Sequence, residues 1–281
     1  MLFFEKIEQN IKELENLGAK VFSIGKSVLS RDIWCLKIGS GKIKIIAQYA
    51  IHAREYITTY LAILHARKLL SYNLNAEIYL VPLVNPDGAS LCVDGLLSVP
   101  FNYQSYLYKI NKSDDFSLWK ANVNAVDLNV NFDAKWASGC KNIFNPSSEN
   151  FVGKVANSEP EVRALINFTE QINPNLTLSF HSKGEVIFYD FYQNLKDKKR
   201  DKKIAKIIKK STGYKILPSG KSAGGYKDWC IEKLKIPAFT IEVGCDSYAH
   251  PIGKEKLPYI WKKTNNIFND LVDYFNTQNL K

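Results

Sequence analysis

The chain has 281 residues, of which 46% are hydrophobic, and it carries a formal net charge of +10 at pH 7. This length and hydrophobic content fit one large α/β domain with an ample core. No stretch reaches the apolar length of a membrane span, and five cysteines without a Cys-x-x-Cys pair argue against a disulfide framework.

The first residues and the cysteines both bear on cellular location. Glu5 and Lys6 bring charge into the N-terminus at once, and no apolar core of a signal peptide follows them. An odd number of cysteines without a disulfide pattern favours a reducing compartment. We therefore expect a cytoplasmic protein without a membrane partner.

Hydrophobic periodicity in the first third of the chain predicts alternating helices and strands. In chain order it indicates an amphipathic helix over residues 4–17, antiparallel strands over 20–24 and 32–38, a buried strand over 43–50, a helix over 56–70 and a strand over 77–83. The sequence Asn85-Pro86-Asp87-Gly88 then predicts a turn.

The middle of the chain is less regular. From residue 89 to residue 157 the pattern dissolves into loops rich in Tyr, Asn, Ser and Phe, and so long an irregular stretch is usually functional. Ser158-Glu159-Pro160-Glu161 predicts a capping box, which opens a helix that ends near Ile172, before Asn173-Pro174.

The last third of the chain again predicts strands, and a helix closes it. The expected strands span residues 176–181, 185–191 and 238–242, and the closing helix spans residues 257–275. A hairpin-like start followed by alternating strands and helices predicts an α/β fold with a mixed central β-sheet flanked by helices. We expect a single domain over residues 1–281.

Much of the positive charge lies in residues 196–210. Ile204, Ala205, Ile207 and Ile208 are spaced as one apolar face of a helix, with lysines on the other face. No aromatic interleaving or known nucleic-acid motif accompanies this run, so we predict a solvated basic helix and no nucleic-acid partner. The positive field would also steer an anionic peptide toward a cleft.

The rare residue types of the chain indicate a candidate site. His52 and His181 each follow an apolar, strand-like run, Glu55 stands three positions after His52, and a third such run ends at Glu242. Ligands of open α/β sheets bind beyond the carboxyl ends of strands. Two imidazoles and one carboxylate make a common catalytic zinc site, and a separate carboxylate then serves as general base.

The repeated placement carries this prediction, because a bare His-x-x-Glu motif is weak. His52 with Glu55, Asn85-Pro86-Asp87-Gly88, His181 and Glu242 all fall just past the end of a separate expected strand. The two remaining histidines lack such a pattern. His65 lies inside a helical pattern and His250 in a loop, so we interpret both as structural or surface residues.

In their order, these motifs resemble those of the zinc carboxypeptidases of the carboxypeptidase A/T superfamily. The resemblance covers roughly residues 20–275. Its matching pieces are His52-Ala53-Arg54-Glu55, Asn85-Pro86-Asp87-Gly88, Asp127-Leu128-Asn129-Val130-Asn131, His181-Ser182, Ala223-Gly224-Gly225 and Ile241-Glu242.

This resemblance implies a metallopeptidase with one Zn²⁺ per chain. It implies that His52, Glu55 and His181 bind the zinc and that Glu242 is the general base and proton shuttle. It also implies that Asp127 binds the far ring nitrogen of His52. A carboxylate in that position orients a ligating imidazole and makes it more basic.

Three departures from the family pattern concern the substrate. The family usually carries Asn-Arg-Asn in the middle motif, and its arginine clamps the terminal carboxylate of the substrate. This chain has Asn129 and then Val130, which offers no donor. Gly220 lies where the family often has a tyrosine that closes over the substrate. Lys120 stands for an arginine that helps to hold the oxyanion, and it is either a point charge for substrate or a surface lysine.

These features predict a zinc peptidase that hydrolyses an amide bond with metal-activated water. Bacterial members with this pattern include peptidases that cut the γ-D-glutamyl–diaminopimelate bond of peptidoglycan peptides. Diaminopimelate carries an extra amine and an extra carboxylate, so its recognition need not use the standard clamp. We therefore expect a small peptide or muropeptide as substrate.

Three alternatives stay open at this point. A conventional metallocarboxypeptidase acting on α-peptides would need another cation, such as Arg163 or Lys183, to reach the substrate carboxylate. A zinc deacylase or amidase would act on a small N-acyl amino acid. A non-catalytic zinc- or peptide-binding module would have no use for Glu242. The sequence leaves open the scissile bond, the need for a free substrate terminus, the oligomeric state and the physiological metal.

Overall fold

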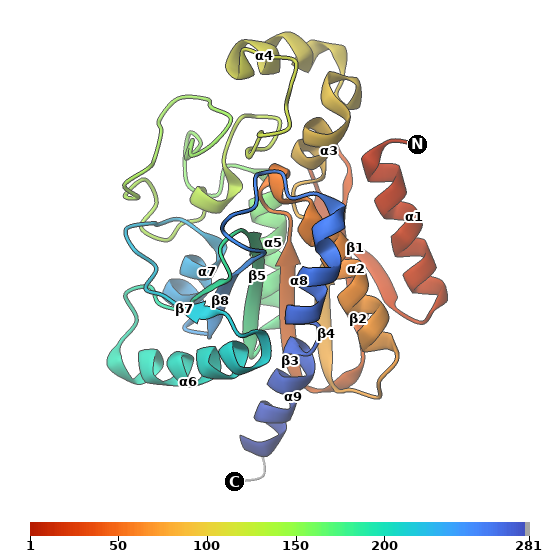
Figure 1. Ribbon diagram of the computed structural model, residues 1–281. Coiled ribbons are helices and arrows are strands. Elements are labelled where there is room, and N and C mark those ends of the chain that lie inside the picture. Colours follow the sequence, from red (N-terminus) through yellow and green to blue (C-terminus); the bar gives the residue numbers. More distant parts are fainter. Residues whose placement is uncertain (279–281) are drawn as a thin grey trace.

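A mixed sheet of eight strands runs through the centre of the molecule, which the computed structural model describes for residues 1–278 (Figure 1). The strands are β1 (Lys20–Lys26), β2 (Asp32–Ile38), β3 (Ser40–Tyr49), β4 (Asn75–Val81), β5 (Leu176–Ser182), β6 (Val186–Phe188), β7 (Lys215–Ile216) and β8 (Ala238–Val243). Their order across the sheet is β1-β2-β4-β3-β5-β8-β6-β7. The strands β4, β3, β5 and β8 run parallel to one another. The pairs β1-β2, β2-β4 and β6-β8 are antiparallel, and β7 pairs in parallel with β6. The predicted mixed sheet is confirmed.

Helices cover both faces of this sheet (Figure 1). They are α1 (Phe3–Asn16), α2 (Ile57–Leu70), α3 (Pro86–Asp94), α4 (Phe101–Asn111), α5 (Pro160–Ile172), α6 (Leu195–Thr212), α7 (Tyr226–Trp229), α8 (Leu257–Thr264) and α9 (Ile267–Gln278). Short helical turns are η1 (Ala53–Glu55), η2 (Gly95–Ser98), η3 (Leu128–Val130), η4 (Cys230–Leu234) and η5 (Lys254–Lys256). No helix within residues 1–278 is long and apolar enough to cross a membrane.

The core has two main layers because successive side chains of a strand point to opposite faces. In β3, Ile45 packs into a cluster with the helices α1, α2, α6, α8 and α9. Its neighbour Ile46 packs into a second cluster with α5 and α7. Both faces of β3 are therefore buried from Ile45 to Tyr49, and both faces of β5 are buried along its whole length.

The stretch from residue 89 to residue 157 is less irregular than predicted. Asn85 does not simply make a turn. Its side chain accepts a hydrogen bond from Gly88 N (3.0 Å), and Pro86 follows at the first helical position, so α3 begins there. The helix α4 was missed because it buries little apolar surface: Leu107 is its one buried residue, and Phe101 is 84% exposed.

The predicted capping box at residues 158–161 is wrong. Glu159 is the residue before α5 and makes no side-chain cap. The side chains of Glu159 and Glu161 instead accept hydrogen bonds from the buried amide of Asn122, at 2.8 and 3.3 Å. Tertiary contacts therefore outweigh the local pattern, although the helix itself is confirmed.

Two further elements, both in the C-terminal half of the chain, have other boundaries than predicted. The expected strand 185–191 contains only β6, since Ser219 binds the carboxylate of Asp190 (2.9 Å) and holds the chain away from the sheet beyond Phe188. The expected helix 257–275 is divided into α8 and α9.

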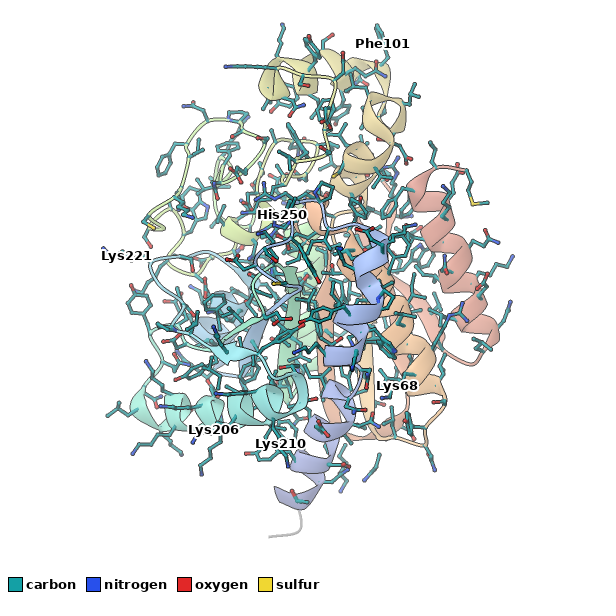
Figure 2. The ribbon with its side chains drawn as sticks, in the orientation of Figure 1. Lys68, Phe101, Lys206, Lys210, Lys221 and His250 are labelled. Carbon is teal, nitrogen blue, oxygen red and sulfur yellow. The ribbon has the colours of Figure 1, made fainter. Side chains whose placement is uncertain are left out.

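The basic segment is a helix, as predicted. In α6 the side chains of Ile204, Ala205 and Ile208 are buried, whereas Lys206 and Lys210 are exposed at the edge of the molecule (Figure 2). His65 is a packing residue of α2, where its Nδ1 lies 2.9 Å from the hydroxyl oxygen of Tyr49. Burial lowers the pKa of His65 to about 3, so its imidazole is neutral at physiological pH.

Candidate active site

The site forms where the parallel strands β3, β5 and β8 end. His181 of β5 and Glu242 of β8 are direct partners across the sheet, and β3 lies on the other side of β5. The chain leaves β3 at Tyr49 and reaches His52 three residues later, from where η1 brings in Glu55. Parallel strands bring their carboxyl ends to one edge of a sheet, so residues far apart in the sequence meet there.

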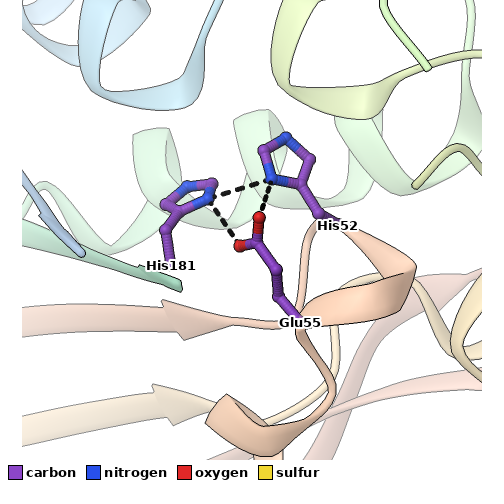
Figure 3. A group of neighbouring side chains, drawn as sticks. All are labelled: His52, Glu55 and His181. Atoms are coloured by element: carbon purple, nitrogen blue, oxygen red, sulfur yellow. Dashed lines mark hydrogen bonds and ion pairs between the residues drawn. The ribbon is translucent and has the colours of Figure 1, made fainter. Parts of the chain in front are cut away.

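His52, Glu55 and His181 converge on one point (Figure 3). His52 Nδ1 lies 2.9 Å from Glu55 Oε1, and His181 Nδ1 lies 3.0 Å from Glu55 Oε2. The two Nδ1 atoms are 3.1 Å apart. All three side chains are buried. Among the described residues, this is the one group of three potential metal donors that meets in this way.

The donor set fits a zinc ion. Two ring nitrogens that face each other across 3.1 Å beside a carboxylate present lone pairs to the same point. Zinc takes imidazole and carboxylate ligands at about 2.0–2.2 Å in tetrahedral sites, which brings such atoms together. Burial raises the pKa of Glu55, but His52 and His181 outweigh it, so the pKa lies well below its ordinary value. Glu55 is therefore ionised, as a metal ligand must be.

Asp127 lies behind His52, where the resemblance places it. Its Oδ1 is 3.4 Å from His52 Nε2, and its two oxygens also accept hydrogen bonds from Asn129 N and Asn150 N, both at 3.1 Å. Lys120 Nζ pairs with Asp127 Oδ2 at 2.8 Å. Burial raises the pKa of Asp127, but Lys120 and His52 outweigh it and hold this pKa below its ordinary range.

Lys120 is therefore not a surface lysine. Its side chain is 14% exposed, and it lines the cleft beside His52 while its ammonium group holds Asp127. Sequence alone offered no sign of this pairing, because Lys120 and Asp127 are seven residues apart in an irregular segment.

Replacing Lys120 with methionine should destabilise the fold by about 1.5–3 kcal/mol, because a charged hydrogen-bond partner of a buried carboxylate is lost. Asp127 has a depressed pKa in the folded chain, so its interactions stabilise the fold above the unfolded pKa of 3.8 and less as pH falls below it. The destabilisation should therefore be largest near pH 6–7 and smaller near pH 3. Urea unfolding of both proteins across this pH range measures it, and a pH-independent difference would contradict the ion-pair explanation.

Glu242 faces the same cleft from β8. It lines the cavity next to His52 and Lys120, and it also lines a second cavity beside it. Burial raises the pKa of Glu242 to about 7, with the charge of Glu55 adding to this and His181 opposing it. A carboxyl group whose pKa is near neutral both accepts and donates a proton at physiological pH.

Two adjoining cavities form the cleft. The wider one has a volume of about 450 Å³ and the smaller one, here called the side cavity, about 200 Å³. The residues that line both are Asn129, Phe188, Ser219, Ser222 and Glu242. The residues that line only the side cavity are Gly225, Lys227, Asp228 and Thr240. Of these, sequence reasoning missed Lys227 and Asp228, although they lie two and three residues after Gly225.

Asn129 and Val130, the two positions of the middle motif that we expect to contact substrate, line the cleft. Val130 borders the wider cavity, and its backbone packs tightly on Gly224, where an added Cβ would lie 2.7 Å from the Val130 carbonyl oxygen. Gly224 has φ +82°, a conformation that favours glycine. Asn129 Oδ1 accepts a hydrogen bond from Tyr226 N (3.1 Å), which directs the amide group of Asn129.

The two cations considered for the missing clamp, and the tyrosine nearest to the expected closing position, lie outside the two cavities. Arg163, which lies on α5, donates a hydrogen bond to the carbonyl oxygen of Asn157 (3.1 Å), and Lys183 pairs with the side chain of Asp246. Neither residue lines either of the two cavities. Tyr226 is buried with its hydroxyl 2.8 Å from Thr169. Arg163 and Lys183 therefore do not supply a cation to the cleft, whereas Lys120, Lys141 and Lys221 line its wider cavity.

This combination of fold and donor set fits a zinc metallopeptidase. Residues 5–267 match the family model for zinc carboxypeptidases, and the chain belongs to this family. The family is zinc-dependent, which agrees with the convergence of His52, Glu55 and His181.

Several relatives have names that indicate peptide hydrolysis. Gamma-D-glutamyl-L-diamino acid endopeptidase 1 of Lysinibacillus sphaericus is 33% identical over 248 residues, which cover 82% of this chain and 62% of that protein. An uncharacterized protein of Bacillus subtilis is 29% identical over 93% of this chain and 74% of its own length. Bovine carboxypeptidase A1 is 28% identical over 78% of this chain and 56% of its own length. The chain thus spans less than two thirds of the first and third of these relatives.

Solved structures share the fold. Bovine thrombin-activatable fibrinolysis inhibitor, in complex with a tick carboxypeptidase inhibitor, superimposes with a TM-score of 0.76 at 20% identity over 97% of each chain. The murein-tripeptide amidase of Escherichia coli O157 gives a TM-score of 0.59 at 20% identity over 92% of this chain and 93% of its own. At these identities the likeness concerns the fold alone.

Proposed function

We propose that this chain is a zinc peptidase that hydrolyses the γ-D-glutamyl–diaminopimelate bond of peptidoglycan peptides. One observation carries the proposal: the groups for hydrolysis are complete, whereas Val130 and Gly220 leave out the apparatus for an ordinary C-terminal residue. The relative from Lysinibacillus sphaericus, 33% identical, is named for γ-D-glutamyl-L-diamino acid peptides and supports the same substrate class.

In this proposal His52, Glu55 and His181 hold the zinc. Zinc held there would supply a Lewis acid for a scissile carbonyl and would make a bound water more acidic. Asp127 orients His52 through its far ring nitrogen, and Lys120 keeps Asp127 ionised. Glu242 takes a proton from the attacking water and delivers it to the leaving amine, for which its raised pKa is suited.

The substrate part of the proposal depends on the hydrogen-bond donor that is missing because Val130 stands where the family usually has an arginine. An arginine binds a carboxylate through two parallel hydrogen bonds, and valine has no donor. The loss of one charge-assisted bond weakens binding by about 1.5–3 kcal/mol, roughly ten- to a hundredfold. An α-peptide that offers only its C-terminal carboxylate for recognition loses this binding free energy. Diaminopimelate has a second charged centre and keeps other contacts.

We expect the enzyme to cleave L-Ala-γ-D-Glu-meso-diaminopimelate at the γ-glutamyl bond and to be slow on blocked α-dipeptides. Val130→Arg should raise kcat/KM for α-dipeptides relative to the muropeptide by about tenfold or more, since it restores a charge-assisted donor in the cleft. Mass spectrometry of products from a mixture of both substrates measures the ratio. Val155→Arg is the matched control, because Val155 is exposed and lines neither cavity.

A native preference of tenfold or more for α-peptides with an aromatic or basic C-terminal residue would contradict this substrate and support a conventional carboxypeptidase. Zinc binding without turnover on any of these peptides would instead support a non-catalytic module.

We further propose that residues 1–281 act as one metallopeptidase catalytic domain in the cytoplasm, without nucleic-acid partners. The support is that one sheet joins β1 to β8 and that all five cysteines are free thiols, as a reducing compartment allows. Cell fractionation with a reporter on the protein tests the location.

A further inference from the structure

One helix carries most of the excess positive charge of the chain. The helix α6 holds nine basic and two acidic residues, so it accounts for seven of the ten net positive charges. Its ion pairs within residues 1–278 involve Lys198 and Arg200. Other lysines of α6 are exposed and pair with no carboxylate in that range. Six of them, here called the lysine face, are Lys199, Lys202, Lys203, Lys206, Lys209 and Lys210.

The lysine face lies on the outer side of α6. Its members are spaced by three or four residues along the helix, which places their side chains on one side of it. Figure 2 shows Lys206 and Lys210 at the edge of the molecule. The opposite side of α6 is occupied, because Ile204, Ala205 and Ile208 pack into the core beneath the sheet. The helix therefore offers a partner its cationic side alone.

The spacing of the lysines makes them act together. Side chains three or four residues apart on a helix are about 5–6 Å from each other. This is less than the Debye length of about 8 Å at physiological ionic strength, so neighbouring ammonium groups repel one another and their fields add. From Lys199 to Lys210 the face extends over about 16 Å. One small anion would neutralise a part of it, whereas an extended anionic surface pairs with all of it.

Two exposed apolar side chains stand at the N-terminal end of the lysine face. Leu195 begins α6 four residues before Lys199, on the same side of the helix, and it is 78% exposed. Tyr192, three residues earlier, is 80% exposed. Tyrosine rings are enriched at the headgroup level of bilayers, and a leucine beside cations finds hydrocarbon there. The edge of a phosphate polymer offers no such hydrocarbon, so the combination favours a lipid surface over a nucleic acid.

The same end of α6 adjoins the cleft. Lys198 Nζ pairs with the carboxylate of Asp190 at 3.4 Å. That carboxylate also accepts a hydrogen bond from Ser219 N (2.9 Å), and Ser219 lines both cavities. An enzyme that is bound through this end of α6 therefore keeps its cleft close to the bound surface.

We propose that the lysine face, together with Leu195 and Tyr192, binds the surface of an anionic phospholipid bilayer. Helices with about four to eight clustered basic residues bind the anionic lipids of the cytoplasmic leaflet. The sequence-based expectation of no membrane partner considered spans and signal peptides. Contact with a bilayer surface needs neither, and it agrees with the lack of a membrane-spanning helix in residues 1–278.

Co-sedimentation with lipid vesicles tests the proposal. Vesicles of equimolar phosphatidylglycerol and phosphatidylcholine should bind the wild type, vesicles of phosphatidylcholine alone should not, and high salt should release the protein. One lysine near an anionic surface contributes about fivefold in affinity. The triple variant Lys202→Gln, Lys206→Gln, Lys210→Gln should therefore bind about a hundredfold more weakly. Absence of wild-type binding, equal binding to both kinds of vesicle, or undiminished binding of the triple variant would overturn the proposal.

A matched triple variant separates the lysine face from net charge. Lys12→Gln, Lys42→Gln, Lys154→Gln removes the same number of charges from exposed lysines outside α6. It should bind the anionic vesicles as the wild type does. A loss as large as that of the α6 variant would show that the charge of the whole chain is responsible, and the lysine face would be refuted. Circular dichroism of both variants confirms that they are folded.

The apolar contact and the rival polyanion are tested on the same protein. Leu195→Ser should weaken vesicle binding by about tenfold, since a leucine side chain no longer leaves water. Duplex DNA at the same phosphate concentration should bind more weakly than the vesicles. If DNA binds as tightly and Leu195→Ser has no effect on vesicle binding, the face recognises polyanions in general and the lipid assignment is wrong.

Discussion

Glutamine in place of Glu242 should remove most of the turnover while the zinc content and the fold remain unchanged. The amide has nearly the same shape as the carboxylate but cannot take a proton from water. General acid–base catalysis contributes typically about 10²–10⁴-fold, and we expect kcat to fall by at least this factor. Glu242 is absent from the three converging donors, so zinc should stay bound. The measurement is kcat on the γ-D-glutamyl substrate together with metal analysis of the same sample.

Glu170→Gln provides the control for this experiment, because Glu170 is an exposed carboxylate at the surface end of α5. It makes the same chemical change and should leave kcat unaltered. If Glu242→Gln turns over at nearly the wild-type rate, the general base lies elsewhere and the mechanism proposed here is wrong.

The pH profile of the wild type gives a second view of Glu242. Its deprotonated form accepts the proton, so kcat/KM should decrease as the pH falls through the Glu242 pKa. Burial raises this pKa to about 7, and the positive charge of bound zinc lowers it again. The acidic limb of the profile should be lost in Glu242→Gln, where the residual rate no longer depends on this group.

The candidate reacting groups could be predicted from the sequence because each lies in the last residues of a parallel strand or shortly after it. An apolar run of the length of a buried strand predicts where the chain leaves the sheet, and the polar residue just beyond it then lies at the sheet edge. This reasoning identified His52, Glu55, His181 and Glu242 as candidates. It could not show that His181 and Glu242 are neighbours, since the order β3-β5-β8 is a property of the tertiary structure.

The burial of Lys227 and Asp228 beside the cleft was harder to predict, for a physical reason. The two charged residues are adjacent in the sequence. They are buried because the segment around Asp190 and Phe191, almost forty residues earlier, covers them: the Asp190 carbonyl accepts from Lys227, and the Phe191 ring lies 5.5 Å from its Nζ. Burial of a charge depends on such long-range contacts, which leave no local pattern.

The sequence also failed to predict the helix α3, for a different reason. Asn85-Pro86 is a turn signal, but an asparagine before a proline is also a helix start, with the asparagine as cap and the proline at the first position. The choice between them depends on whether the next turn finds a surface to pack on. In α3 the residues Pro86 to Cys92 are all buried, so packing decides in favour of the helix.

Alanine in place of His181 should remove most of the zinc from the purified protein and, with it, nearly all activity. Catalytic zinc sites use three protein ligands, and two do not hold the ion firmly. Asp127→Asn gives a graded comparison, because it keeps all three ligands and changes the carboxylate that His52 shares with Lys120. Loss of such a partner typically weakens metal affinity or activity by about 10–100-fold.

Zinc affinity should therefore decrease from the wild type to Asp127→Asn and further to His181→Ala. Competition with a chromophoric chelator measures it. Circular dichroism of the same samples separates loss of metal from loss of fold. His52→Ala should resemble His181→Ala, since the two imidazoles are equivalent donors 3.1 Å apart. If His52→Ala and His181→Ala both retain full zinc, the metal lies elsewhere in the chain and the assignment of these three residues is wrong.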